Sequence, residues 1–334
     1  MAAMAARSLL AASPRRPTAA LRSTLPGARS LIEVVAVKFG LQISSFTWPG
    51  GPEQLAPTLA RVVRTADQAG FDSIWVMDHF FQIRSIGRPE EPMLEGMTAL
   101  GWMAAHSERA RLGLMVGGIH YRHPGLWIKA ATTLDVLSGG RAWFGIGAAW
   151  NQQESVALGF PFPPLGVRFE LLEDTLRMAH GMWSGEQGSE EDFEGRHYHA
   201  TRLLNSPQAI SRPRIPIMIG GGGEQKTLRL VAQYADATNV FGGPEKIHHK
   251  YEVLRRHCEA VGRPYEDIER SNLQSVNVDP AGADGAESPA QVTDRFAELA
   301  DAGAQHVIFS VRDVWQTDKL ELLGRTLLAD LRHL

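Results

Sequence analysis

From Val37 onward the chain alternates short apolar, often β-branched runs with longer amphipathic segments, and this alternation constrains its fold more than any other feature. Runs of strand character occupy residues 37–43, 73–77, 111–116, 141–147, 216–220, 237–241, 271–278 and 306–310. Segments of helical period occupy residues 53–69, 125–137, 167–183, 224–234, 244–262 and 289–302. Such alternation predicts an α/β fold, in which helices cover a parallel sheet. Eight units in about 300 residues fit a (β/α)₈ TIM-type barrel better than two Rossmann halves.

The composition is that of a globular protein. Of the 334 residues, 44% are hydrophobic and 21% are charged, which excludes a disordered chain. The net charge of −3 gives no electrostatic reason to expect nucleic acid or an anionic membrane as a partner. Because Cys258 is the single cysteine, we expect no intrachain disulfide and a reducing, cytoplasmic location. No apolar run approaches the ~18 residues that a membrane span requires.

Two segments depart from the repeating order. Residues 1–36 are rich in Ala, Arg, Ser and Pro, as transit peptides are, although a disordered leader or an over-extended start is the favoured interpretation. Residues 37–334 are then expected to form one barrel domain. Within it, residues 184–214 are too long and polar for a plain connection, so we expect an insertion that lies over a barrel rim as a lid.

In a barrel, chemistry is expected at the carboxyl ends of the strands. The second predicted strand ends in Met77-Asp78-His79, and histidine is the natural proton carrier near pH 7. One of the two polar groups can enter the barrel mouth while the other holds a neighbouring loop. Alternatively, Asp78 caps the following loop and His79 only packs; the residues by themselves leave both possibilities open.

Four consecutive glycines separate the strand predicted at 216–220 from the helix that follows it: Gly220, Gly221, Gly222 and Gly223. Converging backbone N–H groups at the start of a helix favour a bound phosphate over a merely flexible turn. Gly145 and Gly147 do not begin a dinucleotide fingerprint, because Trp150 stands where the third glycine belongs. They instead allow a flat ligand to approach the backbone, with Trp150 as a stacking wall or a core plug.

Metal-dependent and acyl-transfer chemistry have little support. His197-Tyr198-His199 has the spacing of a barrel metallohydrolase, but it lies in the acidic insertion rather than at the end of the first strand. No Gly-x-Ser-x-Gly elbow is present, and Cys258 lies within a predicted helix. We therefore expect no metal site.

Several blocks of the sequence, in the same order, resemble the luciferase-like oxidoreductases, and in particular the branch that uses the deazaflavin coenzyme F420. The blocks between Val37 and Asn239 are VKFGLQIS, ADQAGFDSIWVMDHF, YRHPGLWIKAATTLDVLSGGRAWFGIGAAWN, GFPFPPLGVRFELLEDTLRMAHGMWSG and IPIMIGGGGEQKTLRLVAQYADATN. The resemblance implies a TIM-type barrel that dimerises, with a flavin or deazaflavin lying across the carboxyl ends of the strands.

The resemblance also implies roles for particular residues. Asp78 and His79 match the Asp-His pair beside the deazaflavin ring. The end of the third strand matches a segment that backs the ring, often through a non-prolyl cis peptide whose position here is left open. The coenzyme contacts implied in this way are Asp78, Met115, Val116, Gly117, Gly147, Trp150, Gly220, Gly221, Gly222 and Gly223.

Two departures from the sugar-phosphate dehydrogenases of this family narrow the substrate. Their catalytic glutamate corresponds in position to Trp150, and their tryptophan after the Asp-His pair is replaced by Gln82 or Ile83. Both differences argue against glucose 6-phosphate as the substrate.

The function expected from this resemblance is hydride transfer between F420 and an unidentified small organic molecule, in either direction. His79 is expected to carry the proton, and Asp78 to hold the ring or the histidine. One alternative is an FMN-dependent monooxygenase of the same superfamily. Another is a barrel that binds a flavin without turnover.

Overall fold

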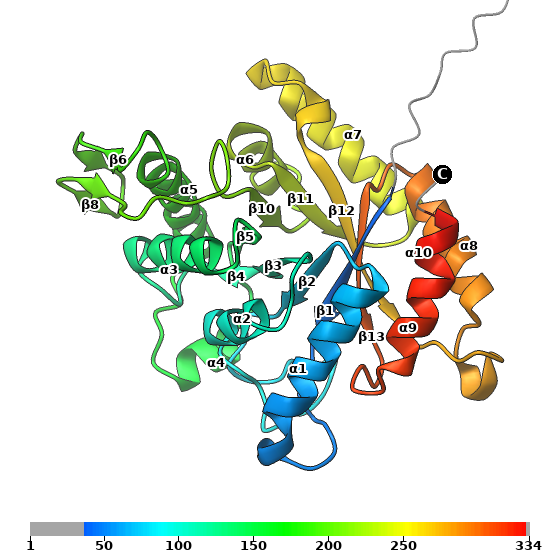
Figure 1. Ribbon diagram of the computed structural model, residues 1–334. Coiled ribbons are helices and arrows are strands. Elements are labelled where there is room, and N and C mark those ends of the chain that lie inside the picture. Colours follow the sequence, from blue (N-terminus) through cyan, green and yellow to red (C-terminus); the bar gives the residue numbers. More distant parts are fainter. Residues whose placement is uncertain (1–36, 332–334) are drawn as a thin grey trace, which may run out of the picture. The chain divides into compact units, whose positions relative to one another are not determined.

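Eight parallel strands close into a barrel in the computed structural model, which describes residues 37–331. The strands are β1 (Lys38–Ile43), β2 (Ser73–Val76), β3 (Arg111–Leu114), β5 (Ala142–Gly147), β10 (Ile217–Gly220), β11 (Ala237–Phe241), β12 (Glu269–Val276) and β13 (His306–Val311). They pair in this order, and pairing of β13 with β1 closes the ring. A short strand, β4 (Gly117–Gly118), continues beside β5. The predicted (β/α)₈ barrel is therefore confirmed (Figure 1).

Helices lie around the outside of the strands (Figure 1). They are α1 (Pro52–Ala69), α2 (Gly96–Ala104), α3 (Pro124–Leu137), α4 (Gln152–Ala157), α5 (Leu165–Met182), α6 (Thr227–Tyr234), α7 (Pro244–Val261), α8 (Pro289–Asp301), α9 (Asp318–Arg325) and α10 (Leu327–Leu331), with short 3₁₀ turns at Tyr265–Asp267 and Ala283–Gly285. The helical periods predicted α1, α3, α5, α6, α7 and α8. They did not predict α2, α4, α9 or α10. Of these four helices, α4 and α10 are shorter than seven residues.

Local sequence explains where helices begin and end. The apolar face of α1 buries Leu59 and Val62, and Gly70 ends the helix at φ 97°, a left-handed conformation that suits glycine. At the start of α8, Ser288 and Gln291 form a capping box, in which each side chain accepts the other residue's backbone N–H.

Alternating side chains divide each strand between two apolar clusters. Residues such as Phe39 and Leu41 point outward and belong to the larger cluster, which includes the helices. The smaller cluster fills the barrel interior and consists of Trp75, Met115, Trp143, Met218, Ala237 and Ile308. A packed interior leaves the ends of the strands, rather than a pore, to form a site.

The insertion at residues 184–214 forms two short antiparallel ribbons. One pairs β6 (Gly188–Ser189) with β9 (Leu203–Leu204), and the other pairs β7 (Phe193–Glu194) with β8 (His199–Ala200). The insertion binds the outer helices: Asp135 of α3 accepts the backbone N–H of Ile210 at 2.7 Å, and Asp174 of α5 accepts that of His197 at 2.8 Å. None of its residues lines the site cavity described below. A lid function for this segment stays a prediction.

The two spaced histidines of the insertion bind different carboxylates. His197 Nε2 lies 2.8 Å from Glu170, and His199 Nδ1 lies 2.7 Å from Glu194. Across residues 37–331, no group of three His, Cys, Asp or Glu side chains is arranged to hold a metal ion.

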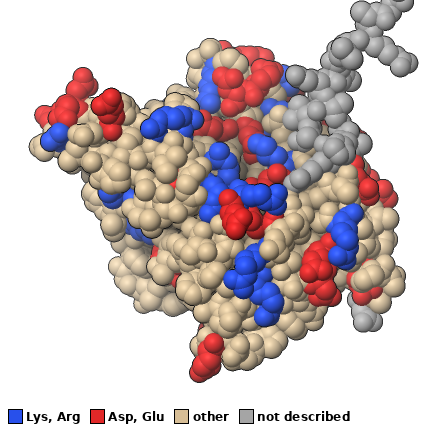
Figure 2. All heavy atoms as spheres, in the orientation of Figure 1, with Lys and Arg blue, Asp and Glu red and all other residues tan. Residues whose placement is uncertain are grey.

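Charges of both signs are mixed on the face shown in Figure 2, where Lys and Arg lie beside Asp and Glu. Ion pairs among the described residues include Lys38 with Glu269 and Arg214 with Asp236. No helix within the described part of the chain is long and apolar enough to cross a membrane. The predicted leader, residues 1–36, lies outside the described residues.

Candidate active site

A cavity of about 380 Å³ opens at the carboxyl ends of β2, β3, β5, β10 and β11. It brings together most of the predicted site residues, namely Asp78, His79, Met115, Val116, Gly117, Gly147, Trp150, Gly220, Gly221 and Gly223. Gly222 does not line the cavity; a Cβ at that position would stand 3.6 Å from Cε of Lys250. Tyr121, Leu165, Phe169 and Phe241 complete much of the remaining wall.

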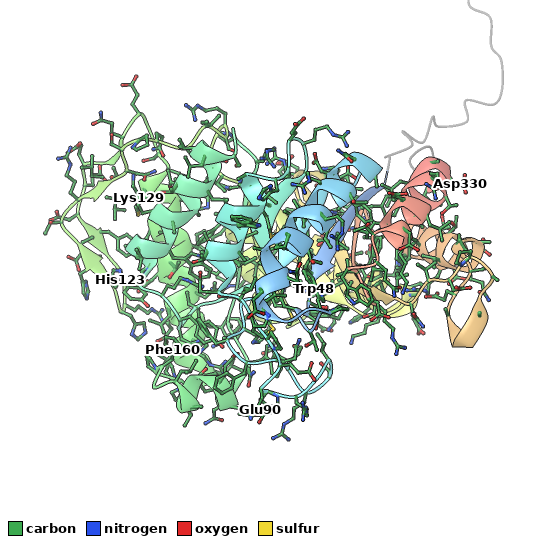
Figure 3. The ribbon with its side chains drawn as sticks, turned by 60° about the horizontal axis from the view of Figure 1, so that its bottom comes forward. Trp48, Glu90, His123, Lys129, Phe160 and Asp330 are labelled. Carbon is green, nitrogen blue, oxygen red and sulfur yellow. The ribbon has the colours of Figure 1, made fainter. Side chains whose placement is uncertain are left out.

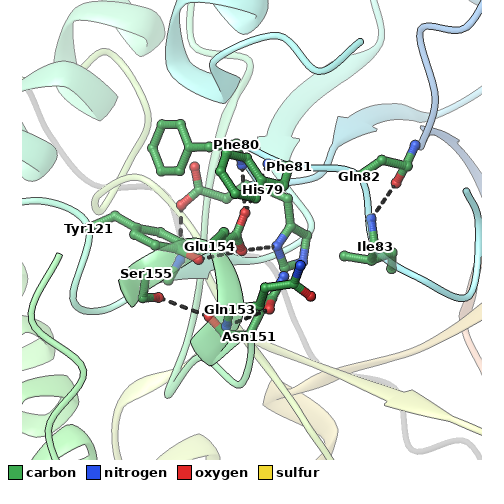
Figure 4. A network of polar contacts seen from close by, with 12 residues as sticks. His79, Phe80, Phe81, Gln82, Ile83, Tyr121, Asn151, Gln153, Glu154 and Ser155 are labelled. Atoms are coloured by element: carbon green, nitrogen blue, oxygen red, sulfur yellow. Dashed lines mark hydrogen bonds and ion pairs between the residues drawn. The ribbon is translucent and has the colours of Figure 1, made fainter. Parts of the chain in front are cut away.

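His79 is held by a glutamate that the sequence analysis did not single out. Its Nδ1 lies 2.5 Å from Oε1 of Glu154, which is fully buried (Figure 4). The His79 ring also meets Trp150 edge to face, with ring centres 5.4 Å apart. Within residues 37–331, Nε2 of His79 has no hydrogen-bond partner, and the residue lines the cavity. The Nδ1 proton is thus directed to the carboxylate, while Nε2 remains available to a ligand.

Glu154 is itself fixed by further hydrogen bonds. Its Oε2 accepts the backbone N–H groups of Phe80 at 2.8 Å and Phe81 at 3.1 Å, and its Oε1 accepts the Tyr121 hydroxyl at 2.6 Å. Burial raises the pKa of this carboxyl, but the hydrogen bonds from His79 and Tyr121 outweigh burial, so the pKa of Glu154 lies below its usual value. Glu154 is therefore an ionised acceptor at neutral pH.

A partial signal for Glu154 is present in the sequence. Asn151 caps α4, accepting the N–H of Gln153 at 3.2 Å, and a glutamate three residues after such a cap is typical of a capping box. Glu154 does not close that box. Its side chain reaches instead to His79, 75 residues away in sequence.

Asp78 does not hold the histidine, which corrects that part of the prediction. Its carboxylate forms a bidentate pair with Arg122, at 2.7 and 2.8 Å, and accepts the N–H of Gly118 at 2.9 Å. Arg122 also contacts Glu95, the N-cap of α2. Although burial opposes the charge, the hydrogen bonds and charges of Asp78 and Glu95 raise the pKa of Arg122. Asp78 therefore fastens the loop after β3 to the end of β2.

The end of β3 forms one wall of the cavity. The Met115–Val116 peptide bond is cis, at the strand end where the resemblance implied such a bond. Val116 packs closely against two glycines. A Cβ added to Gly220 would lie 2.6 Å from the Val116 side chain, and one added to Gly147 would lie 3.0 Å from it. Glycine at both positions allows three strand ends to approach one another.

The glycine turn presents free backbone donors. Gly221 has φ 121°, which L side chains rarely adopt. The N–H groups of Gly222 and Gly223 donate to no acceptor in the described range 37–331. Beside them Lys250 lies 2.6 Å from Glu224, and α6 begins four residues after Gly223. Free N–H groups, a helix start and a nearby ammonium group together suit an anionic ligand.

A second histidine near the cavity behaves differently. His120 is buried, its Nε2 lies 2.7 Å from the Ser155 hydroxyl, and its Nδ1 has no partner among residues 37–331. Because Ser155 donates to the Asn151 carbonyl at 2.8 Å, it accepts from His120, which places the proton on Nε2. Burial, followed by the charge of Arg168, lowers the pKa of His120 to about 4. This imidazole is neutral at pH 7.

Comparison with known proteins shows the family. Residues 37–284 match the model of the luciferase-like monooxygenase family, and the chain belongs to this family. An F420-dependent glucose-6-phosphate dehydrogenase of Kineococcus radiotolerans is 31% identical over 239 residues, covering 69% of this chain and 68% of the relative. An enzyme of the same name from Nakamurella multipartita is 29% identical over 242 residues, covering 70% and 68%.

Solved structures agree on the fold. The coenzyme F420-dependent tetrahydromethanopterin reductase of Methanopyrus kandleri superposes with a TM-score of 0.71 at 18% identity, over 89% of this chain and 99% of that one. The long-chain alkane monooxygenase LadA superposes with a TM-score of 0.73 at 12% identity, over 89% and 91%. At these identities the likeness establishes the barrel alone.

Proposed function

We propose that this protein is an oxidoreductase that uses coenzyme F420 to transfer a hydride to or from a small organic substrate. The observation that carries the proposal is the His79 imidazole, which has Nδ1 held by buried Glu154 and Nε2 open to the cavity. The F420-dependent activity in the names of the relatives supports this choice of coenzyme.

The residues present fit such a coenzyme. The free N–H groups of Gly222 and Gly223, with Lys250 beside them, would hold its phosphodiester. Met115 and Val116 would back the ring. When bound, the deazaflavin supplies a two-electron, hydride-carrying ring with little reactivity toward oxygen. The protein then has to position the ring, exclude water and manage one proton.

His79 is suited to manage that proton. With its Nδ1–H directed to an ionised carboxylate, the neutral ring carries its lone pair on Nε2 and can accept a proton from a substrate hydroxyl. In the reverse direction the imidazolium, stabilised by Glu154, donates the same proton to a carbonyl oxygen. Glu154 is thus the positioning residue of the pair, and Tyr121 keeps Glu154 in place.

A titration of F420 and FMN against the same preparation tests the coenzyme. We expect F420 to bind more tightly and its absorbance at the deazaflavin band to bleach or recover when a substrate turns over. Tightly retained FMN and oxygen-dependent turnover would instead support an FMN-dependent enzyme with monooxygenase activity, and monooxygenase is the activity that the family description names. Binding of F420 with no turnover by any alcohol or carbonyl compound would support a barrel that only binds its coenzyme.

We further infer a homodimer that works in the cytoplasm. The single cysteine supports a reducing location, and the resemblance to dimerising family members supports the assembly. Light scattering on the purified chain measures its mass directly, and a monomer at micromolar concentration would contradict the dimer.

A further inference from the structure

A second hollow, of about 550 Å³, lies at the same end of the barrel as the candidate active site. It is formed by the segments that follow β1, β12 and β13, which are the strands not used by the first cavity. Trp48, Asn277 and Trp315 come from these three segments. In Figure 3, Trp48, Glu90 and Phe160, which follow strand carboxyl ends, lie lower in the view than Lys129 and Asp330.

The two hollows share a loop. The segment after β2 supplies His79 to the first cavity and Ile86 to the second. Between them, Gln82 Nε2 donates to the Ser44 carbonyl at 3.1 Å, which ties this loop to the end of β1. The two hollows share no lining residue, so a ligand that reaches from His79 into the second hollow has to pass along this loop.

The second hollow has little positive charge with which to bind an anion. Its Glu287 is paired with Arg295 at 2.8 and 2.7 Å, and its Asp313 lies 3.8 Å from Lys319. Arg312, on the exposed rim, is the one lining cation, and it has no ion pair in the described range. No described residue that lines the first cavity is Lys or Arg. A doubly charged phosphate would thus find a single solvent-screened guanidinium.

The walls instead suit an uncharged molecule with a flat or cyclic apolar part. Trp48 is 8% exposed, and Trp315 lines the hollow together with the buried residues Val276 and Val314. The Ser44 hydroxyl and the Asn277 amide, which also line the hollow, form no hydrogen bond with the described part of the chain. Indole rings stack on flat ligands, and neutral donors and acceptors fix their orientation.

We propose that the substrate is an uncharged alcohol or ketone whose flat or cyclic apolar part lies in the second hollow against Trp48 and Trp315. In the oxidising direction, bound F420 in its oxidised form would accept the hydride from the carbinol C–H bond, and Nε2 of His79 would accept the hydroxyl proton as the carbonyl forms. In ketone reduction, reduced F420 would supply the hydride and the His79 imidazolium the proton. This substrate class rests on the proposed function, and it excludes a sugar phosphate.

The test compares ligands that differ by one phosphate group. Benzyl alcohol and benzyl phosphate form one pair, and glucose and glucose 6-phosphate form the other; each is titrated against the full chain, with and without F420, by saturation-transfer NMR and calorimetry. We expect benzyl alcohol to bind and its phosphate ester to bind about tenfold more weakly or not at all. Trp315→Ala should weaken the binding of benzyl alcohol by about tenfold, whereas Trp315→Phe should retain most of the affinity.

Two results would overturn the substrate class. One is tighter binding of either phosphate ester than of its parent alcohol, with the gain lost in Arg312→Ala. The other is no saturation transfer from benzyl alcohol at millimolar concentration in the folded wild-type chain. The F420 titration of Trp315→Ala is the control that separates the two proposals. Unchanged F420 affinity in that variant, together with weaker binding of benzyl alcohol, supports the substrate class. Failure of F420 to bind even the wild-type protein contradicts the proposed function, and the substrate class is then judged from the binding of benzyl alcohol.

Discussion

At the carboxyl end of the barrel, Nδ1 of His79 lies 2.5 Å from Glu154; at the amino end, Nδ1 of His306 lies 2.7 Å from Glu269. The two pairs have the same chemistry and similar distances. Both join segments far apart in sequence, and in both pairs the histidine is largely buried.

The pairs differ at the other ring nitrogen. Nε2 of His306 is bound to the Ser73 hydroxyl at 2.9 Å, and that hydroxyl accepts the indole N–H of Trp75 at 2.6 Å. The His306 side chain is 2% exposed, whereas that of His79 is 14% exposed and its Nε2 has no partner in residues 37–331. The amino-end network fastens β2, β12 and β13 together. The same pair serves structure where both nitrogens are occupied and is open to chemistry where one is free.

The largest expected effect is on turnover. His79→Ala should lower the rate of hydride transfer by about 10²–10⁴-fold, the usual loss for a general acid or base, while the fold is retained because Glu154 keeps three other hydrogen-bond donors. His306→Ala is the matched control, and we expect it to destabilise the fold by ~1–3 kcal/mol because Glu269 and Ser73 lose a partner. Its activity per folded molecule should remain normal. Single-turnover kinetics and urea unfolding on both variants measure these effects, and a folded His79→Ala enzyme at full rate would end the proton-carrier assignment.

Substitutions of the two glutamates, Glu154 and Glu269, should differ in their effect on turnover in the same way. Glu154→Gln weakens the contact that holds Nδ1 of His79, so we expect turnover to fall by about 10²-fold. Glu269→Gln should leave turnover per folded molecule unchanged. Identical rate losses in the two variants would show that both pairs act only through stability.

Acid stability should depend on the amino-end pair. Burial alone would raise the pKa of Glu269, but the hydrogen bond and charge of His306, with Lys38, lower it from 4.5 to about 2. A carboxyl whose pKa is lowered on folding stabilises the protein above pH 4.5, and this contribution is lost as pH falls toward 2. The loss should be roughly 3 kcal/mol, and Glu269→Gln should abolish that part of the pH dependence. A wild-type unfolding free energy that is flat from pH 4.5 to 2 would contradict this assignment.

A histidine without a carboxylate sharpens the comparison. The pKa of His120 is lowered from 6.5 to about 4, chiefly by burial, so only the unfolded chain takes up its proton between these values. Stability is therefore complete above pH 6.5 and falls by up to roughly 3 kcal/mol as pH approaches 4. In His120→Gln the slope of unfolding free energy between pH 6.5 and 4.5 should be smaller, and an unchanged slope would assign it elsewhere.

The smallest expected effect concerns the glycine turn, outside both pairs. Gly222 has ordinary φ and meets only Lys250 at 3.6 Å, so Gly222→Val should fold normally. It should weaken F420 binding by about tenfold, because a side chain there hinders approach to the backbone N–H groups. Gly243→Ala, at the N-cap of α7 and with open space around its Cβ, is the control. Equal F420 affinity in the two variants would put the phosphodiester elsewhere.

Much of the fold could be predicted from local pattern. The eight barrel strands and the capping box at Ser288 follow from periodicities of two and 3.6 residues and from turn chemistry, which act over a few neighbours. Helices α4 and α10 were missed because one or two turns provide too little periodicity. Strand-end position was also enough to select His79 and the glycine turn as candidates.

By itself, then, the sequence determined the barrel, the end of it that carries the site, and the residue types that could serve there. The period within each strand and the alternation of strands and helices along the chain can be read from neighbouring residues. Tertiary structure alone decided the partners: Glu154 rather than Asp78 binds His79, and Asp78 pairs with Arg122. The contact between His79 and Glu154 spans 75 residues and depends on how β2 and β5 are placed in the closed ring. Two side chains meet across such a separation only when the whole barrel has closed, so no local pattern encodes which carboxylate will be within 3 Å.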